Sequence, residues 1–141
     1  MEPNESQVIP SMQRLAALTA LIATSAPFAA PTVGLYANSV PLNPSTTLAG
    51  LNPATFVGYA ATVGMVWGTP YIDSDGSALV FGTVITQVCT APTTPNTIYG
   101  FYLTDSGVTL LKAAYAFLTP VGIVAADQAV TFLPALRYSG T

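Results

Sequence analysis

Charged side chains are scarce in this sequence: Lys, Arg, Asp and Glu make up 6% of its 141 residues, against about 25% in an ordinary soluble domain. Apolar residues make up 51%. A compact monomer of 14.5 kDa exposes about 6,900 Å² of surface. So few charged side chains are spread thinly over that area. Such a surface predicts self-association, or cover by a larger assembly.

Histidine is absent, and cysteine and lysine occur once each, as Cys89 and Lys112. Without histidine, Ser/His/Asp and Cys/His catalysis and the commonest zinc ligand are excluded. One cysteine allows no disulfide within the chain, and we interpret Cys89 as a small buried apolar side chain. Only Arg14 and Arg137 add further positive charge. Since nucleic-acid binding requires several phosphates to be neutralised, we expect no nucleic-acid partner, and no residue set indicates a cofactor.

Long hydrophobic runs are also missing. The best candidate, residues 15–30, is interrupted by hydroxyl-bearing residues and by Pro27, and it is too short for a bilayer, which needs about 20 apolar residues. Glu2 and Glu5 precede it, where a secretory signal would carry basic residues. We therefore expect neither a spanning helix nor a cleaved signal, and no membrane partner.

The composition changes near residue 32. Before it, residues 12–24 repeat apolar side chains at helical spacing between prolines, which predicts one short helix. Because this helix would bury little by itself, we interpret residues 1–31 as an N-terminal arm that leaves the domain and binds another subunit. The side chains expected to make that contact are Leu15, Leu18, Leu21 and Ile22.

Residues 32–141 form the predicted β domain, because β-branched and aromatic residues dominate between Gly, Pro, Asn and Asp. The expected strands are residues 33–36, 55–66, 78–87, 97–104, 108–117 and 129–136, with a short helical turn within 43–51. Short strands with close turns predict a mainly β fold, an antiparallel β-sandwich or small barrel. Residues 97–104 carry apolar side chains on both faces, which favours a sheet held between subunits.

Two acidic turn sequences resemble functional motifs. The sequence from Asp73 to Gly76, with Asp75 between them, resembles the start of a calcium loop, yet no glutamate follows it. A plain β turn is therefore favoured over a weak metal site. Asp105, followed by Ser and Gly after an apolar strand, matches the way aspartic proteases present a carboxylate. A retroviral-type protease stays open as a third function, although we expect Asp105 to serve the turn.

Aromatic side chains are the remaining candidates for contact. Tyrosine and tryptophan offer large contact areas without charge, as residues of protein interfaces do. Packing inside the domain explains the same residues equally well. The positions assigned to an aromatic interaction surface are Trp67, Tyr71, Tyr99 and Tyr102.

One likeness is carried by several short segments, namely residues 35–38, 48–51, 54–60, 67–68, 72–76, 97–105 and 110–111, of which 98–105 is the most specific. Together these segments resemble small structural proteins of tailed bacteriophages. The resemblance covers residues 33–136 and implies a virion structural role, without assigning catalytic residues. The arm before residue 32 lies outside it.

The resemblance and the composition together lead us to expect a non-enzymatic capsid cement or decoration subunit that bridges capsomers of the phage head. The expected partners are copies of the chain itself, with a homotrimer favoured, and the major capsid protein. The expected location is the virion, after synthesis in the host cytoplasm. The alternative is a tail-fibre or tail-tip adhesion module, in which exposed Tyr and Trp would stack on host glycans.

Overall fold

The first sheet of the molecule has the strand order β1-β5-β6. The computed structural model describes residues 15, 16, 18, 19 and 30–138. β5 (Asn96–Thr104) is the central strand and pairs antiparallel with β1 (Thr32–Tyr36) on one side and with β6 (Leu111–Ile123) on the other. Isolated bridges to Thr62 and Pro53 cover the outer edge of β1. β1 is therefore buried along its whole length.

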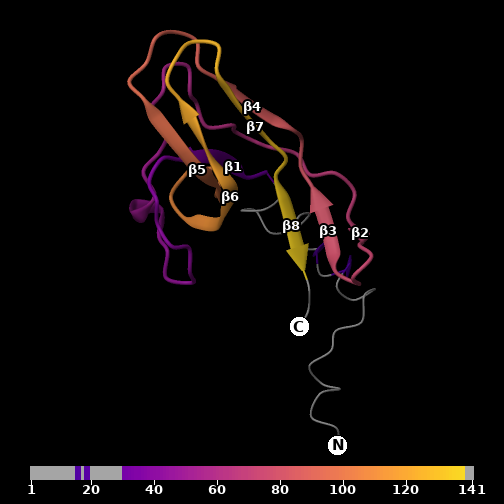
Figure 1. Cartoon of the computed structure of the whole chain (residues 1–141). Helices are drawn as coiled ribbons and strands as arrows, with labels where there is room; N and C mark the ends of the chain where they lie inside the picture. Colours follow the sequence, from indigo (N-terminus) through magenta and orange to yellow (C-terminus); the bar gives the residue numbers. More distant parts are fainter. Residues whose placement is uncertain (1–14, 17, 20–29, 139–141) are drawn as a thin grey trace, which may run out of the picture.

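Two smaller antiparallel sheets complete the described fold (Figure 1). One has the order β2-β3-β8, with strands Tyr71–Ile72, Ala78–Phe81 and Ala135–Tyr138, and the other pairs β4 (Ile85–Val88) with β7 (Ala129–Phe132). β3 leads into β4 and β7 leads into β8, so two long ribbons of chain run side by side from one sheet to the other. The mainly β, antiparallel architecture is confirmed, in a sandwich-like arrangement around a shared core.

Both ribbons are interrupted at the junction between these sheets. The sequence predicts single strands over 78–87 and 129–136, whereas each is divided in two. The N–H of Gly82 donates to the carbonyl of Pro134 at 2.8 Å across the junction. A Cβ at Gly82 would lie 2.1 Å from the Met65 sulfur, and Pro134 has no N–H with which to continue a ladder. Gly82 and Pro134 therefore explain the two breaks.

Residues 55–66 do not form the predicted strand. They run as a loop beside β1, and Thr62 exchanges two backbone hydrogen bonds with Val33, at 2.8 and 2.9 Å. Gly58 and Gly64 have φ values of 95° and 69°, in the left-handed region that interrupts extended backbone. The prediction was wrong because β-branched composition does not reveal these two turns.

The predicted turns are present. η2 (Leu48–Gly50) lies within the expected helical turn. The β2–β3 turn is closed by the Gly76 N–H, which donates to the Asp73 carbonyl at 2.9 Å, and the Val108 N–H donates to the Asp105 carbonyl at 3.0 Å in the β5–β6 turn. Among the residues that the structure describes, no helix is long and apolar enough to cross a bilayer.

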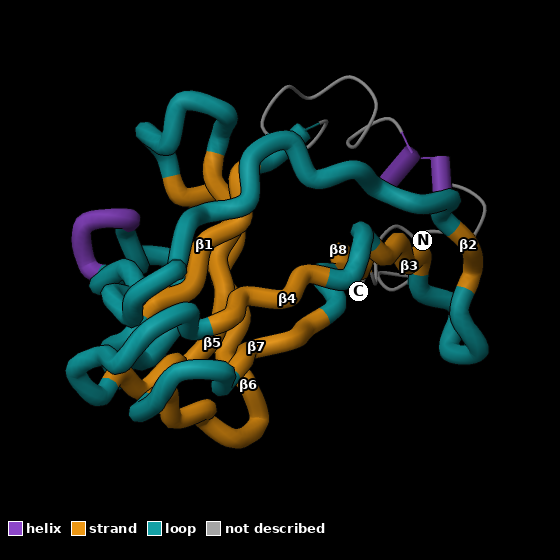
Figure 2. The backbone as a smooth tube through the Cα atoms, turned by 90° about the horizontal axis from the view of Figure 1, so that it is seen from above, coloured by secondary structure: helices purple, strands orange, loops and turns teal. Residues whose placement is uncertain are grey.

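β6 departs from β5 at a wide bulge. The pairs on either side of it are Ile98 with Val121 and Gly100 with Ala116. Tyr99 alone separates these pairs on β5, whereas residues 117–120 separate them on β6. Figure 2 shows β6 curving away from the other strands. We call residues 117–120 the β6 bulge; pairing resumes beyond it, so the strand continues past the end predicted at residue 117.

The core consists of a large apolar cluster shared by all three sheets and a smaller one around Tyr36, Leu51 and Tyr102. Phe101 belongs to the large cluster and Tyr102 to the small one, because successive residues of β5 point to opposite faces. β5 is thus covered on both faces within one chain. The apolar side chains on both faces of residues 97–104 therefore pack on the two clusters of the same chain. This pattern does not require a sheet held between subunits.

The predicted arm contacts the domain at the residues that the structure describes. The described residues between 15 and 19 have helical backbone. Leu18 is 1% exposed and belongs to the large core cluster, and Leu15 packs against that cluster. We expected residues 1–31 to leave the domain. That expectation is wrong for Leu15 and Leu18, because both side chains pack on the core of the same chain. Leu21 and Ile22 lie outside the described residues.

Candidate interaction surface

Four aromatic rings from three strands form a cluster at the centre of the fold. Phe101 of β5 stacks on Tyr115 of β6, with ring centroids 5.0 Å apart, and on Phe132 of β7, at 4.8 Å. Phe117, the first residue of the β6 bulge, lies 6.2 Å from Phe101 and 5.8 Å from Phe132. Such pairs stabilise beyond the area they bury. The cluster therefore holds β6 and β7 together and anchors one end of the β6 bulge.

An apolar groove with a volume of about 420 Å³ opens beside this cluster. Its lining residues are Leu79, Phe81, Phe101, Tyr115, Leu133, Ala135 and Arg137. Leu133 is 44% exposed, so the groove has an apolar wall in contact with solvent. Burial raises the pKa of the Tyr115 hydroxyl, because a phenolate would lose its hydration there. The groove therefore favours uncharged, apolar occupants.

Arg137 is the one charged residue in the wall of the groove, and it is already paired. Its two terminal nitrogens each lie 3.0 Å from a carboxylate oxygen, one of Asp73 and one of Asp75. The other Asp75 oxygen accepts the Ser77 N–H at 2.9 Å. Hydrogen bonds from Ser77, and to a smaller extent the charge of Arg137, lower the pKa of Asp75. The guanidinium stands where a cation would have to bind.

The calcium-loop resemblance is thus explained by a hairpin turn held by Arg137. Gly76 has a φ of 83°, the geometry that an Asp-Gly turn requires. Among the described residues, no group of three or more Cys, Asp or Glu side chains is placed to hold a metal ion. The favoured interpretation, a plain hairpin connection, agrees with this geometry.

Asp105 is enclosed by hydrogen bonds of its own turn. Its carboxylate accepts the N–H of Thr109 at 2.7 Å, the N–H of Leu110 at 3.0 Å and the Thr109 hydroxyl. These hydrogen bonds lower the pKa of Asp105 to about 2, and the bond from the Thr109 side chain has the largest effect. A protease aspartate instead shares a proton with a second carboxylate. The geometry supports the expected role of Asp105 in the turn.

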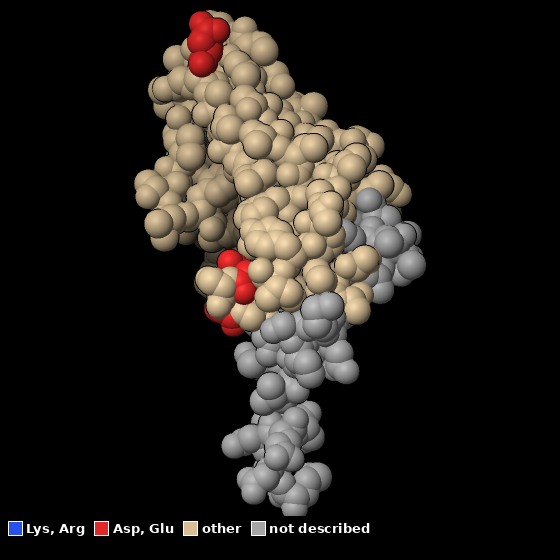
Figure 3. Space-filling model, turned by 90° about the vertical axis from the view of Figure 1, so that its right-hand side faces the viewer, with Lys and Arg blue, Asp and Glu red and all other residues tan. Residues whose placement is uncertain are grey.

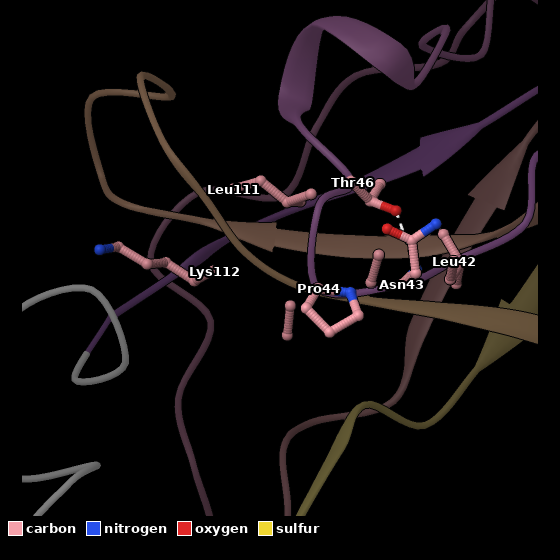
Figure 4. Close-up of a pocket in the computed structure, with 8 residues that line it drawn as sticks. Leu42, Asn43, Pro44, Thr46, Leu111 and Lys112 are labelled. Atoms are coloured by element: carbon pink, nitrogen blue, oxygen red, sulfur yellow. Dashed lines mark hydrogen bonds between the residues drawn. The ribbon is translucent and has the colours of Figure 1, made fainter.

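A second hollow lies where the loop from Leu42 to Thr46 crosses the start of β6 (Figure 4). It has a volume of about 210 Å³. Its polar atoms are used within the loop: the Asn43 N–H donates to the Thr46 hydroxyl at 3.0 Å, and the Asn43 side-chain oxygen accepts the Ser45 N–H at 2.8 Å. Lys112 points away from the other labelled residues. The hollow therefore lacks the convergent polar groups of a small-molecule site.

The four aromatic residues assigned to a surface do not form one. Tyr71 is 43% exposed, whereas Trp67 is half-buried against the large cluster and Tyr99 is half-buried against the small one. Tyr102 is 5% exposed. The pKa of its hydroxyl is raised to about 12, mainly because the group is buried. Its ring fills the space that a side chain at Gly34 would take. The assignment of Tyr102 to the surface was therefore wrong.

The exposed surface of the described residues instead carries several large aliphatic side chains and few charges. On the face in Figure 3, acidic side chains appear only near the top and near the lower edge, and no lysine or arginine is visible. The charged residues of the described part are Asp73, Asp75, Asp105, Lys112, Asp127 and Arg137. The most exposed large apolar side chains are Leu118 at 105%, Val63 at 74%, Val66 at 66%, Val84 at 64% and Leu110 at 58%.

Leu118 is the functional candidate that the sequence reasoning missed. It lies in the β6 bulge, one residue after the anchored Phe117 and two residues before Pro120. A proline inside a strand-like run is typical of a bulge or an edge strand. That signal was present in the sequence at Pro120 and indicates where β6 leaves the ladder.

Comparison with known proteins identifies no relative. No protein-family model, no curated protein and no solved structure matches the chain.

Proposed function

We propose that this chain is a non-enzymatic structural protein of a tailed-phage virion, a capsid cement or decoration subunit that bridges capsomers. One observation carries the proposal: large aliphatic side chains, led by Leu118 and Val63, are exposed on a surface with very few charges. A surface so poor in charge, with large apolar side chains exposed on it, favours association with other protein. Copies of the chain and the major capsid protein are the proposed partners.

Bridging requires contact area and no reactive group. DNA packed in a head loads the capsid lattice, and a subunit seated across a seam adds buried area that resists separation of its neighbours. Asp73 and Asp75 are paired with Arg137 of β8, and Asp105 accepts hydrogen bonds from its own turn, which supports a structural role for these carboxylates. A homotrimer suits this task, because heads offer many three-fold positions.

Copy number in the particle tests the proposal. Quantitative mass spectrometry of purified virions is expected to find hundreds of copies per particle, together with the major capsid protein. A count of a few to tens would place the chain in the tail and favour the adhesion module. Absence from purified particles would refute a virion role of either kind.

The adhesion alternative receives no specific support from the described residues. Glycan binding by stacking needs exposed aromatic faces, and Tyr71 alone among the four assigned aromatics reaches that exposure. Soluble protein should therefore show no binding to host-cell glycans, which a glycan array would measure.

A further inference from the structure

We infer that the bond between Asp75 and Gly76 is a latent site of aspartate isomerisation, which the ion pair with Arg137 helps to keep closed in the folded chain. Aspartate followed by glycine is especially open to this modification, because glycine has no side chain to hinder the attacking nitrogen and allows the backbone to turn freely. The inference does not rest on the proposed function, since it concerns a covalent change within one chain.

The reaction needs only the chain and water. The lone pair of the Gly76 nitrogen attacks Cγ of the protonated Asp75 carboxyl group and forms a new C–N bond. The hydroxyl of that carboxyl group and the proton of the nitrogen leave as water, which produces a succinimide ring. Water then opens the ring: cleavage of the new C–N bond restores aspartate, whereas cleavage of the original peptide bond produces isoaspartate. No atom is gained or lost overall, and nothing is oxidised or reduced.

Both reacting groups have other partners in the folded chain. The Gly76 N–H donates to the Asp73 carbonyl at 2.9 Å. One Asp75 carboxylate oxygen accepts the Ser77 N–H at 2.9 Å, and the other accepts Nη1 of Arg137 at 3.0 Å. Hydrogen bonds from Ser77, and to a smaller extent the charge of Arg137, lower the pKa of Asp75, which keeps the carboxyl group in the ionised form that resists nucleophilic attack. The turn therefore opposes ring closure at the nitrogen and at the carboxyl carbon.

The hairpin around the turn limits movement toward the ring. β2 and β3 pair directly beside it, and the Asp73 N–H donates to the Ser77 carbonyl at 2.8 Å. Arg137 belongs to β8, the neighbour of β3, so its guanidinium joins the turn to the next strand of the sheet. Formation of the succinimide therefore requires the turn to open locally.

Isoaspartate makes such an opening permanent. It adds a methylene group to the backbone and places the free carboxylate on the α-carbon. The turn bond between Asp73 and Gly76 and the contacts of Asp75 then cannot all form again with the same geometry. The modified hairpin is held less firmly to β8, because Arg137 loses one of its two carboxylate partners.

Incubation of the full chain at mildly acidic pH tests the inference, with peptide mapping by electron-transfer dissociation, which distinguishes isoaspartate from aspartate at each position. Isoaspartate at Asp75 should form at least about 10-fold more slowly in the native chain than in the chain unfolded by urea, because the turn must first open. Arg137→Gln should raise the native rate about 2- to 5-fold, the effect of losing an exposed ion pair. Equal rates in the native and unfolded chain, or no rise with Arg137→Gln, would overturn the inference.

Lys112→Gln is the matched control, because it removes the same charge from a side chain outside this turn. It should leave the rate at Asp75 unchanged, and a rise equal to that of Arg137→Gln would contradict a specific role for the ion pair. Asp105, whose carboxylate is held by its own turn, is the internal reference and should convert at the same rate in the unmodified chain and in Arg137→Gln. An equal rise at Asp105 and Asp75 would mean that the fold has loosened generally, and the inference would fail.

Discussion

Replacing Gly100 with alanine is expected to destabilise the first sheet at the edge of the β6 bulge. A Cβ at Gly100 would lie 2.0 Å from the carbonyl oxygen of Tyr115 and 2.7 Å from the ring of Tyr36. The carbonyl belongs to the backbone of β6, so it cannot rotate away as a side chain would. β5 and β6 must separate locally to admit the methyl group, which breaks the pairing of Gly100 with Ala116.

The magnitude follows from that obstruction. Inserting a methyl group into a packed interior costs about 1 to 3 kcal/mol, and movement of backbone puts Gly100→Ala at the upper end, about 3 kcal/mol. In a chain of this size that corresponds to a fall in Tm of about 10 °C. Urea unfolding, followed by far-UV circular dichroism at one fixed protein concentration, measures the free energy of unfolding.

Gly122→Ala is the matched control for this experiment. Gly122 also lies in the β5–β6 ladder, opposite Thr97, but a Cβ there would meet no atom within 4 Å. The same chemical change should therefore alter the free energy of unfolding by less than about 1 kcal/mol, in either direction. Equal unfolding midpoints for Gly100→Ala and Gly122→Ala would refute the reasoning.

Three further predictions concern the arm, the cysteine and the β5–β6 turn. Leu18→Ala should lower the free energy of unfolding by about 2 to 5 kcal/mol because Leu18 is a core residue; an unchanged urea midpoint would mean that Leu18 contacts another subunit instead. The buried Cys89 thiol, which donates to the Ala91 carbonyl at 3.1 Å, should react with a thiol reagent only after unfolding, and rapid labelling of native protein would contradict this placement. The pKa of Asp105 is lowered to about 2, so its stabilising effect should be complete above the ordinary carboxyl pKa of about 4 and lost as the pH falls towards 2. Asp105→Ala should remove that part of the pH dependence of the urea midpoint, and the same slope in both proteins would count against the turn geometry.

Local chemistry made the turns and the central strands predictable. Asp73 to Gly76 and the turn after Asp105 carry residues whose side chains and backbone preferences define a turn in any context. β1 and β5 combine β-branched and aromatic residues without internal breaks. The loop over residues 55–66 has a similar composition, but whether such a segment finds a ladder depends on partners far away in the chain.

The interaction surface was less predictable, because exposure depends on tertiary packing. Tyr102 and Tyr71 are the same residue type, yet Tyr102 fills the space beside Gly34 whereas Tyr71 is 43% exposed on a short strand. Leu18 was assigned correctly to an apolar helix face, but the spacing does not tell which surface that face meets. Pro120 indicates where β6 leaves the ladder, but the projection of Leu118 is evident only from its exposure in the folded chain.

The two ribbons that pass between the smaller sheets give the molecule a direction of mechanical strength. β4 and β7 are paired from Ile85 with Phe132 to Val88 with Ala129. Tension applied along these ribbons acts parallel to the strands, so it loads all the ladder hydrogen bonds together instead of opening them one after another. Bending is easier, because it concentrates at Gly82 and Pro134, which share one backbone hydrogen bond at the junction. The described fold therefore resists stretching along one axis, while its two smaller sheets can tilt relative to each other at this junction.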